Sequence, residues 1–187
     1  LVGGVPRRGI ARLNLDGSLD TSFDTDGKQT IDFLSRNRGS GVAVQGDGKI
    51  VVVGYVIDSA SYQAGLVRYN PDGSLDTSFG GTGKVITPVF DYFFPYAIAI
   101  DGNGKIVIAG EAWNGTNYDA AVVRYLSNGS LDTAFSGDGI FSFPFGAAGL
   151  NDGALAVAIQ GDNKIVVAGT AYNGTNWDFA VARVTIG

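Results

Sequence analysis

The chain has 187 residues, of which 45% are hydrophobic and 17% charged, and its formal net charge is −5 at pH 7. This is the composition of a globular protein, and it includes no basic run for nucleic-acid phosphates and no apolar stretch long enough for a membrane-spanning helix. We therefore expect no nucleic-acid partner and no membrane insertion. Cysteine and histidine are absent, so we also expect no disulfide or imidazole chemistry.

The first predicted strand, residues 9–14, leads into a segment that is repeated along the chain. Gly-Ser-Leu-Asp-Thr-Ser-Phe at 17–23 recurs at 73–79 and, with one change, at 129–135. Similar copies of Lys-Ile-Val-Val-Val-Gly occur at 49–54, 105–110 and 164–169. An arginine within an apolar run recurs at Arg12, Arg68, Arg124 and Arg183. Three markers in one order identify a tandem repeat.

Each repeat predicts four strands, which we call A to D in chain order. Strand A is expected at 41–44, 97–100 and 156–159, and alternates Gly or Ala on one face with Val or Ile on the other. The small face lets neighbouring strands approach closely. Strand B starts at Ile50, Ile106 and Ile165 and is apolar on both faces, as in a strand covered on both sides.

Turn residues separate these strands. Asp47-Gly48, Asn103-Gly104 and Asp162-Asn163 stand between A and B and predict hairpins. Strand C carries the repeated arginine. Strand D is expected at 85–90 and 140–145, where Pro88 and Pro144 would confine it to a sheet edge.

A small inner strand, a doubly covered second strand and a proline-bearing outer strand are typical of a propeller blade. We predict an all-β fold of tandem four-stranded antiparallel blades of a β-propeller; a solenoid is the alternative. Residues 1–40 would form a partial repeat (strands C and D), 41–96 and 97–155 full repeats, and 156–187 a partial repeat (strands A to C), all in one domain. Closed propellers have about four to eight blades, so we expect part of a larger ring, completed by further blades or by a second copy of the chain.

The segment Arg-Tyr-Asn-Pro-Asp-Gly-Ser-Leu-Asp-Thr-Ser-Phe-Gly (68–80), together with the Lys-Ile-Val-Val strands, resembles the bacterial delta-sixty repeat. The resemblance covers nearly the whole chain. It implies propeller-like repeats of large exported proteins, with no assigned activity. We therefore expect an extracellular or cell-surface location. Because the chain lacks methionine, Leu1 is not a translational start, and we expect a processed protein or a part of a longer one.

Two loops between strands B and C place aromatic residues beside amides and carboxylates, a pattern that suits stacking on sugars and hydrogen bonding to their hydroxyls. The candidate ligand-binding residues are Trp113, Asn114, Tyr118 and Asp119 in one loop, and Tyr172, Asn173, Trp177 and Asp178 in the other. The corresponding loop at 57–62 matches less well. The alternative is a cross-strand aromatic pair that only fixes the hairpin.

The oxygen-rich loops at 14–20 and 70–76 have side chains that suit calcium. The candidate ligands are Asn14, Asp16, Asp20, Asn70, Asp72 and Asp76, whereas the third copy has Leu126 and Asn128 at two of these positions. The alternative is a tight turn in which Asp20, Asp76 and Asp132 cap a short helical turn. These three aspartates are also the expected partners of the repeated arginines. No other cofactor is expected.

Little in the sequence predicts catalysis. Glu111 is the only glutamate and stands where the other repeats have Tyr55 and Thr170, which we interpret as a solvated position. A glycosidase would need two carboxylates in one cleft. We predict a module without enzymatic activity, with a structural or protein-interaction role. The alternative is a lectin-like module that binds polysaccharide.

Overall fold

The computed structural model describes residues 8–31, 33, 37–58 and 61–185. Within these residues the chain forms thirteen strands and one 3-10 turn, η1 (Phe79–Gly81). The strands make four antiparallel sheets that follow one another in chain order. We call these sheets blades 1 to 4. Blade 1 contains β1 (Arg8–Ala11) and β2 (Lys28–Ile31), and blade 2 contains β3 (Asn37–Val44), β4 (Ile50–Asp58), β5 (Ser61–Tyr69) and β6 (Lys84–Thr87). Blade 3 contains β7 (Phe93–Ile100), β8 (Ile106–Trp113), β9 (Tyr118–Tyr125) and β10 (Ile140–Phe143), and blade 4 contains β11 (Asp152–Ile159), β12 (Ile165–Tyr172) and β13 (Trp177–Val184).

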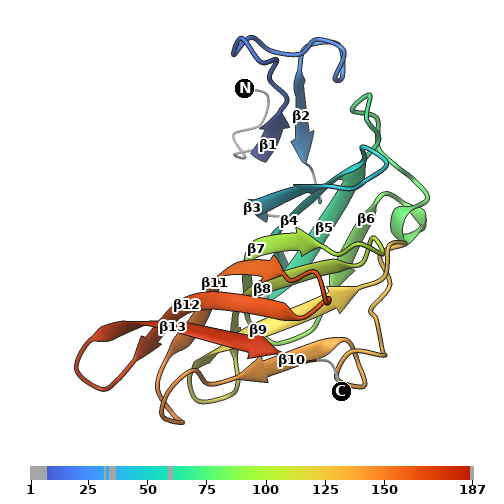
Figure 1. The fold of residues 1–187 in the computed structure, drawn as a ribbon. Helices are drawn as coiled ribbons and strands as arrows, with labels where there is room; N and C mark the ends of the chain where they lie inside the picture. Colours follow the sequence, from blue (N-terminus) through green and yellow to red (C-terminus); the bar gives the residue numbers. More distant parts are fainter. Residues whose placement is uncertain (1–7, 32, 34–36, 59–60, 186–187) are drawn as a thin grey trace.

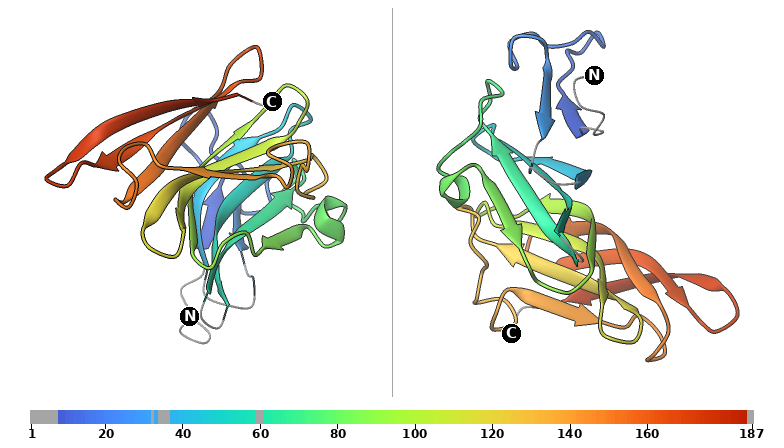
Figure 2. Two further views of the ribbon diagram at one scale, coloured as in Figure 1. Left: turned by 90° about the horizontal axis from the view of Figure 1, so that it is seen from below. Right: turned by 180° about the vertical axis from the view of Figure 1, so that it is seen from behind.

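The sheets stack face to face along an arc, with blade 1 at one end and blade 4 at the other (Figures 1 and 2). The innermost strands β3, β7 and β11 contact one another in succession, while β6 and β10 lie at the outer sheet edges. Radially stacked antiparallel sheets of this kind are the blades of a β-propeller. The predicted fold class is confirmed, with blade 1 formed by strands C and D and blade 4 by strands A to C.

The outer strands are shorter than predicted. We expected strand D to include Pro88 and Pro144, but β6 ends at Thr87 and β10 ends at Phe143. Each proline directly follows the last paired residue. Proline lacks the N–H that would continue the ladder, so it ends the strand and does not sit within it.

The inner strands are longer than predicted, because each extends past a β-bulge. The register of β3 shifts between Gly39 and Gly41, and β7 and β11 shift at the equivalent places. The glycine that ends the Lys-Ile-Val-Val-Val-Gly marker lies opposite this bulge. A Cβ atom on Gly54 would lie 1.9 Å from the carbonyl oxygen of Arg38. Only glycine allows the two backbones to approach so closely.

The hydrophobic core lies between blades. In blade 2, Val51, Val53, Ala64 and Leu66 form what we call the forward face, which points to the next blade. Ile98 and Ile100 of β7 pack against this cluster from the backward face of blade 3. Blade 3 repeats the pattern with Val107, Ala109, Ala120 and Val122, against which Val157 and Ile159 of β11 pack. The predicted alternation along strand A therefore places its Val or Ile residues against the preceding blade and its Gly or Ala residues on the opposite face of the sheet.

The repeated arginines pair with the repeated aspartates, as predicted. The distance from arginine Nε to aspartate Oδ2 is 2.7 Å in Arg12–Asp20, Arg68–Asp76 and Arg124–Asp132. The last two pairs are buried. Arg68 also donates to the backbone oxygen of Ser127, and Arg12 to that of Pro71, so each side chain reaches into the loop of the following repeat. Among the described residues, no helix is long and apolar enough to cross a membrane.

Candidate functional site

The predicted aromatic pairs lie directly opposite each other at the ends of two hairpins. Trp113 of β8 faces Tyr118 of β9 with ring centroids 5.2 Å apart, and Tyr172 of β12 faces Trp177 of β13 at 5.3 Å. Both are cross-strand pairs that stabilise a hairpin. They also stay accessible, since Trp113 is half-buried and Trp177 is 55% exposed. Packing between strands and exposure to a ligand are therefore both compatible with this geometry.

The polar residues of the same loops are engaged within the loops. Asn114 Nδ2 donates to Asp119 Oδ2 at 2.8 Å, and Asn114 Oδ1 accepts from the backbone N–H of Thr116 and of Asn117. Asn173 repeats the first bond to Asp178 at 2.8 Å. These bonds hold the loops closed, so a sugar hydroxyl would compete with them for the side chains that we proposed as ligands.

A larger aromatic surface, which the sequence did not predict, joins blades 2 and 3. We call it the aromatic belt; it consists of six half-buried residues, Tyr55, Tyr62, Tyr92, Phe94, Trp113 and Tyr118. Neighbouring ring centroids are 4.9 to 6.0 Å apart, within the usual range for aromatic contacts. Phe94 is central, since it contacts Tyr55 and Tyr62 of blade 2 and Tyr118 of its own blade.

Glu111 lies beside this belt. It stands opposite Phe94 in the β7–β8 register, it is half-buried, and its Oε1 accepts a hydrogen bond of 2.6 Å from the hydroxyl of Tyr96. Burial, together with the hydrogen bond to Glu111 and its charge, raises the pKa of Tyr96. Burial and the charge of Glu111 also raise the pKa of Tyr118. The interpretation of Glu111 as a merely solvated residue is therefore wrong, because it supplies a carboxylate to the aromatic surface.

The candidate calcium loops have their oxygens turned to other partners. Asp16 Oδ1 accepts from the backbone N–H and the hydroxyl of Ser18, and these bonds lower the pKa of Asp16. Asp72 has the same relation to Ser74. Asn14 and Asn70 donate to the hydroxyls of those serines at 3.0 Å. Such bonds to the backbone two residues on are typical of tight turns.

Asp20 and Asp76 point to arginine side chains. Their Oδ1 atoms accept from the backbone N–H two residues on, whereas Oδ2 takes the arginine. In the second repeat the N-cap residue of the helical turn η1 is Ser78, which makes no side-chain cap bond. Asp76 therefore caps the turn that precedes η1, through its bond to the N–H of Ser78. In the described part of the chain, no three acidic residues gather as a metal cluster would require. Calcium binding stays a prediction of the sequence.

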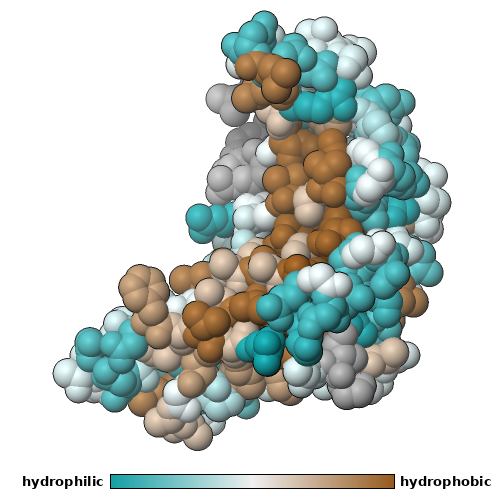
Figure 3. Space-filling model, viewed as in Figure 1, coloured by the Kyte–Doolittle hydropathy of each residue, from teal (hydrophilic) through white to brown (hydrophobic). Residues whose placement is uncertain are grey.

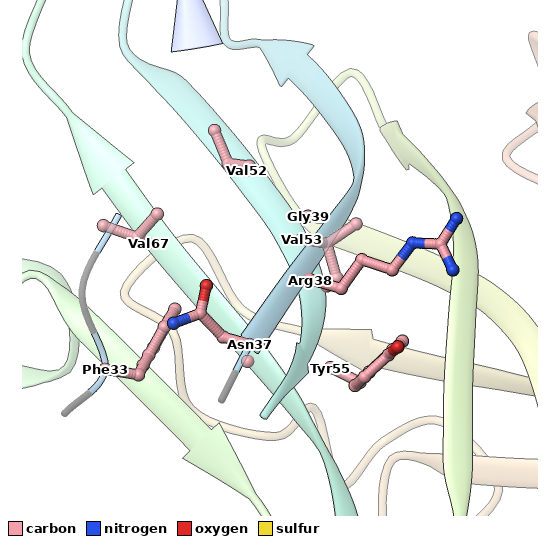
Figure 4. Close-up of a pocket in the computed structure, with 10 residues that line it drawn as sticks. Phe33, Asn37, Arg38, Gly39, Val52, Val53, Tyr55 and Val67 are labelled. Carbon is pink, nitrogen blue, oxygen red and sulfur yellow. The ribbon is translucent and has the colours of Figure 1, made fainter. Parts of the chain in front are cut away.

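The enclosed spaces are small. Figure 4 shows the hollow lined by Phe33, Asn37, Val52, Val53 and Val67, with Arg38 and Tyr55 opposite each other in the β3–β4 register. Its volume of about 10 Å³ is that of a single water molecule. A ligand would therefore bind on an open surface of the described chain and not in this hollow.

The antiparallel sheets that follow one another along the chain and stack through their inner strands define a β-propeller repeat protein. The sequence matches the model of the domain of unknown function (DUF5122) beta-propeller over residues 1–23, 45–79, 102–135 and 160–185. These segments make up more than half of the chain, which therefore belongs to this β-propeller family. No curated protein matches the sequence.

Solved structures to which the chain is similar include an endo-arabinase, a family-43 glycoside hydrolase and a fucose lectin. The endo-arabinase from Bacteroides thetaiotaomicron VPI-5482 has 9% sequence identity and a TM-score of 0.46, over 80% of this chain and 56% of the arabinase. A thermostable family-43 glycoside hydrolase has 11% identity and a TM-score of 0.45, over 95% and 67%. A fucose lectin from Kordia zhangzhouensis, in complex with methyl-fucoside, has 12% identity and a TM-score of 0.39, over 75% and 96%.

Proposed function

We propose that the chain is a structural and protein-interaction module of an exported bacterial protein, without catalytic activity, acting outside the cell or at its surface. The observation that carries this proposal is the forward face of blade 4. Phe179 is 100% exposed and Val181 is 71% exposed, although the equivalent Ala120 and Val122 of blade 3 are completely buried. Large apolar side chains grouped on a surface mark sites of protein interaction.

The environment of the carboxylates supports a role without catalysis. Asp76 and Asp132 are each held by an arginine and a lysine, at 2.7 to 2.9 Å. Glu111 takes the hydroxyl of Tyr96. A glycosidase needs two carboxyl groups that face one cleft with a substrate between them, and these three groups are bound to other side chains.

The resemblance of residues 68–80 to the delta-sixty repeat supports the exported, bacterial setting. In such a setting, blades act as rigid supports whose faces and loops contact other proteins. The module would then keep its fold through the inter-blade clusters and use its end faces for contact.

The proposal is tested by sedimentation velocity over a range of protein concentrations. We expect the chain to associate as concentration rises, and Phe179→Ser with Val181→Ser to abolish the association. Leu15→Ser is the matched control, since Leu15 is a fully exposed apolar residue in a loop of blade 1. A chain that stays monomeric throughout, or that loses association equally in the Leu15 variant, would contradict the proposal.

A second candidate function, carbohydrate binding, is supported by the aromatic belt. Its six half-buried rings stand beside the carboxylate of Glu111, and aromatic faces with a nearby polar group suit sugars. The test is a glycan panel probed with and without calcium. Saturable binding that is lost in Tyr118→Ala and kept in Trp177→Ala, at the other hairpin, would place the sugar on the belt.

A further inference from the structure

We propose that the hollow between β1 and β3 is a docking site for a β-hairpin from a further repeat of the same kind. The first strand of that hairpin would alternate Gly or Ala with larger residues, as strand A does, and the second would be rich in Val and Ile, as strand B is. This inference rests on the proposed role in protein interaction and identifies the partner of one particular surface.

The hollow has a volume of about 450 Å³. It is lined by Gly9 and Ile10 of β1, by Gly39, Ser40, Gly41 and Val42 of β3, and by Val52 of β4. Figure 3 shows apolar side chains in a continuous band below the β1–β2 sheet and over the β3–β6 sheet. None of the lining residues is charged, and the hydroxyl of Ser40 already donates to the carbonyl of Pro95. A polypeptide with an apolar face fits this lining better than a sugar does.

The chain contains two examples of how such a surface is covered. Val42 and Val44 of β3 hold the positions that Ile98 and Ile100 hold in β7, and Val157 and Ile159 in β11. In both later blades these side chains pack against a cluster that includes residues of strands B and C of the preceding blade. Val42 and Val44 are instead 58% and 65% exposed. Within the described residues, the same strand position is therefore covered by an apolar cluster in blades 3 and 4 and is mostly exposed in blade 2.

The closeness of the covered interfaces explains the small residues expected in the docked strand. At the interface of blades 2 and 3, a Cβ atom added to Gly41 would lie 3.0 Å from Cγ2 of Ile98. A docked strand over Val42 therefore needs Gly or Ala at the facing positions. This requirement separates a repeat hairpin from an arbitrary apolar peptide.

The edge of β1 provides the second point of attachment. The equivalent strands β5 and β9 each pair with a strand B on one side and a strand D on the other. Among the described residues, β1 is hydrogen-bonded to β2 alone, in a two-stranded sheet. The free N–H and C=O groups of a sheet edge bind an added strand. A docked hairpin would complete blade 1 with the strand order of blades 2 and 3.

The hydrophobic cluster between blades 1 and 2 is smaller than the other two inter-blade clusters, and among the described residues it contains none from strand A or strand B of blade 1. Phe23 and Ile10 of blade 1 pack against Ile50, Val52 and Val67 of blade 2. The other two interfaces also contain strand-B residues of the preceding blade, Val51 and Val53 in one and Val107 and Ala109 in the other. The hollow lies on the side of β1 where the equivalent strand-B residues of a docked hairpin would be placed.

The probe is a fluorescently labelled synthetic peptide of residues 93–113, which spans β7 and β8. We expect saturable binding to the folded chain by fluorescence anisotropy, and slower hydrogen exchange of the β1 amides when the peptide is bound. A peptide of the same composition with scrambled order should not bind. Val42→Asp with Val44→Asp should weaken binding by roughly tenfold or more, because two apolar contacts are replaced by charges.

The matched control is Ile86→Asp, which places a charge on an exposed aliphatic side chain of β6, at the opposite edge of the blade 2 sheet from β3. It should bind the peptide as the unchanged chain does. Circular dichroism verifies that each variant is folded, and the exchange measurement on the unchanged chain tests the site without any variant. Absence of binding, binding without protection of β1, or equal weakening in the control would overturn the docking site. If peptide docking fails but the chain still associates through Phe179 and Val181, the proposed function stands without the docking site. If neither peptide binding nor association is observed, the docking site and the proposed function are both wrong.

Discussion

Arg68 and Asp76 form a buried ion pair that also joins two blades. Arg68 Nε donates to Asp76 Oδ2 at 2.7 Å, and its guanidinium lies 4.7 Å from the ring centroid of Phe79. Another of its nitrogens donates to the backbone oxygen of Ser127, in the next repeat. The repeated arginine therefore holds its own turn and the following one.

We predict that Arg68→Ala destabilises the fold by about 1.5 to 3 kcal/mol, because it removes one of the two cations that hold the buried carboxylate of Asp76 and leaves Lys49 as the other. The side chains of this pair are only 7% and 8% exposed. The equivalent Arg12–Asp20 pair is 31% and 24% exposed, so Arg12→Ala should cost about 1 kcal/mol or less. Urea unfolding of the two variants measures both values. Equal losses would show that burial does not govern the contribution of this pair.

We predict that stability falls in acid through the same aspartates. Burial acts to raise the pKa of Asp76, but hydrogen bonds from Ser78 and Lys49 and the charge of Arg68 outweigh it, so that the pKa lies well below its ordinary value of 3.8. A pKa that is lowered by folding adds stability above the unfolded value, and this is lost as pH falls through the folded value. The free energy of unfolding should therefore decrease as pH drops below 3.8.

The control for this acid effect is Asp76→Asn, which cannot titrate. The variant should be less stable at neutral pH and should lose less stability than the unchanged chain between neutral and acid pH. Urea unfolding at a series of pH values compares the two slopes. Parallel curves would assign the acid effect to other carboxylates.

We predict that glycine is required opposite each bulge. In Gly110→Ala the new Cβ atom would lie 2.1 Å from the carbonyl oxygen of Phe94, and the strands would have to separate. Overpacking of this kind costs about 3 kcal/mol. Gly102→Ala is the control, since nothing lies within 4 Å of its added Cβ atom. Thermal unfolding should show a large loss for the first variant and little change for the second.

We predict that the two tryptophans differ in their access to solvent. Trp177 is 55% exposed at the end of the arc, whereas Trp113 is half-buried in the aromatic belt. In Trp113→Phe only Trp177 remains to emit, and acrylamide should quench it strongly. In Trp177→Phe the remaining Trp113 should be quenched less. The reverse order would mean that the belt is open in solution.

The repeat made most of the fold predictable. Its glycines and arginines located the hairpins and ion pairs, and even the exceptional Asp162-Asn163 turn follows from the residue type, since Asn163 adopts a positive φ of 63°. The bulges were not predictable, because each extra residue is recognised only when two strands are paired. This is why Tyr96, which stands at the bulge of β7, was not connected with Glu111 in advance.

The aromatic belt escaped prediction for a related reason. Tyr55 and Phe94 come from different blades, and their contact depends on how the sheets stack. The candidate residues Trp113 and Tyr118 were correctly placed together because they share one hairpin. Local pairs follow from spacing along the chain, whereas a surface that crosses blades follows from three-dimensional packing.

The arginine that reaches into the next repeat has a consequence for how the molecule opens. Each such bond makes the order of one blade depend on that of its neighbour, as in a row of units with nearest-neighbour coupling. At blade 4 the corresponding Arg183 is exposed, whereas Arg68 and Arg124 are buried. Local opening should therefore start at β13 and travel inward, so that amide hydrogens exchange fastest there and slowest in β8, which is enclosed on both faces by neighbouring blades.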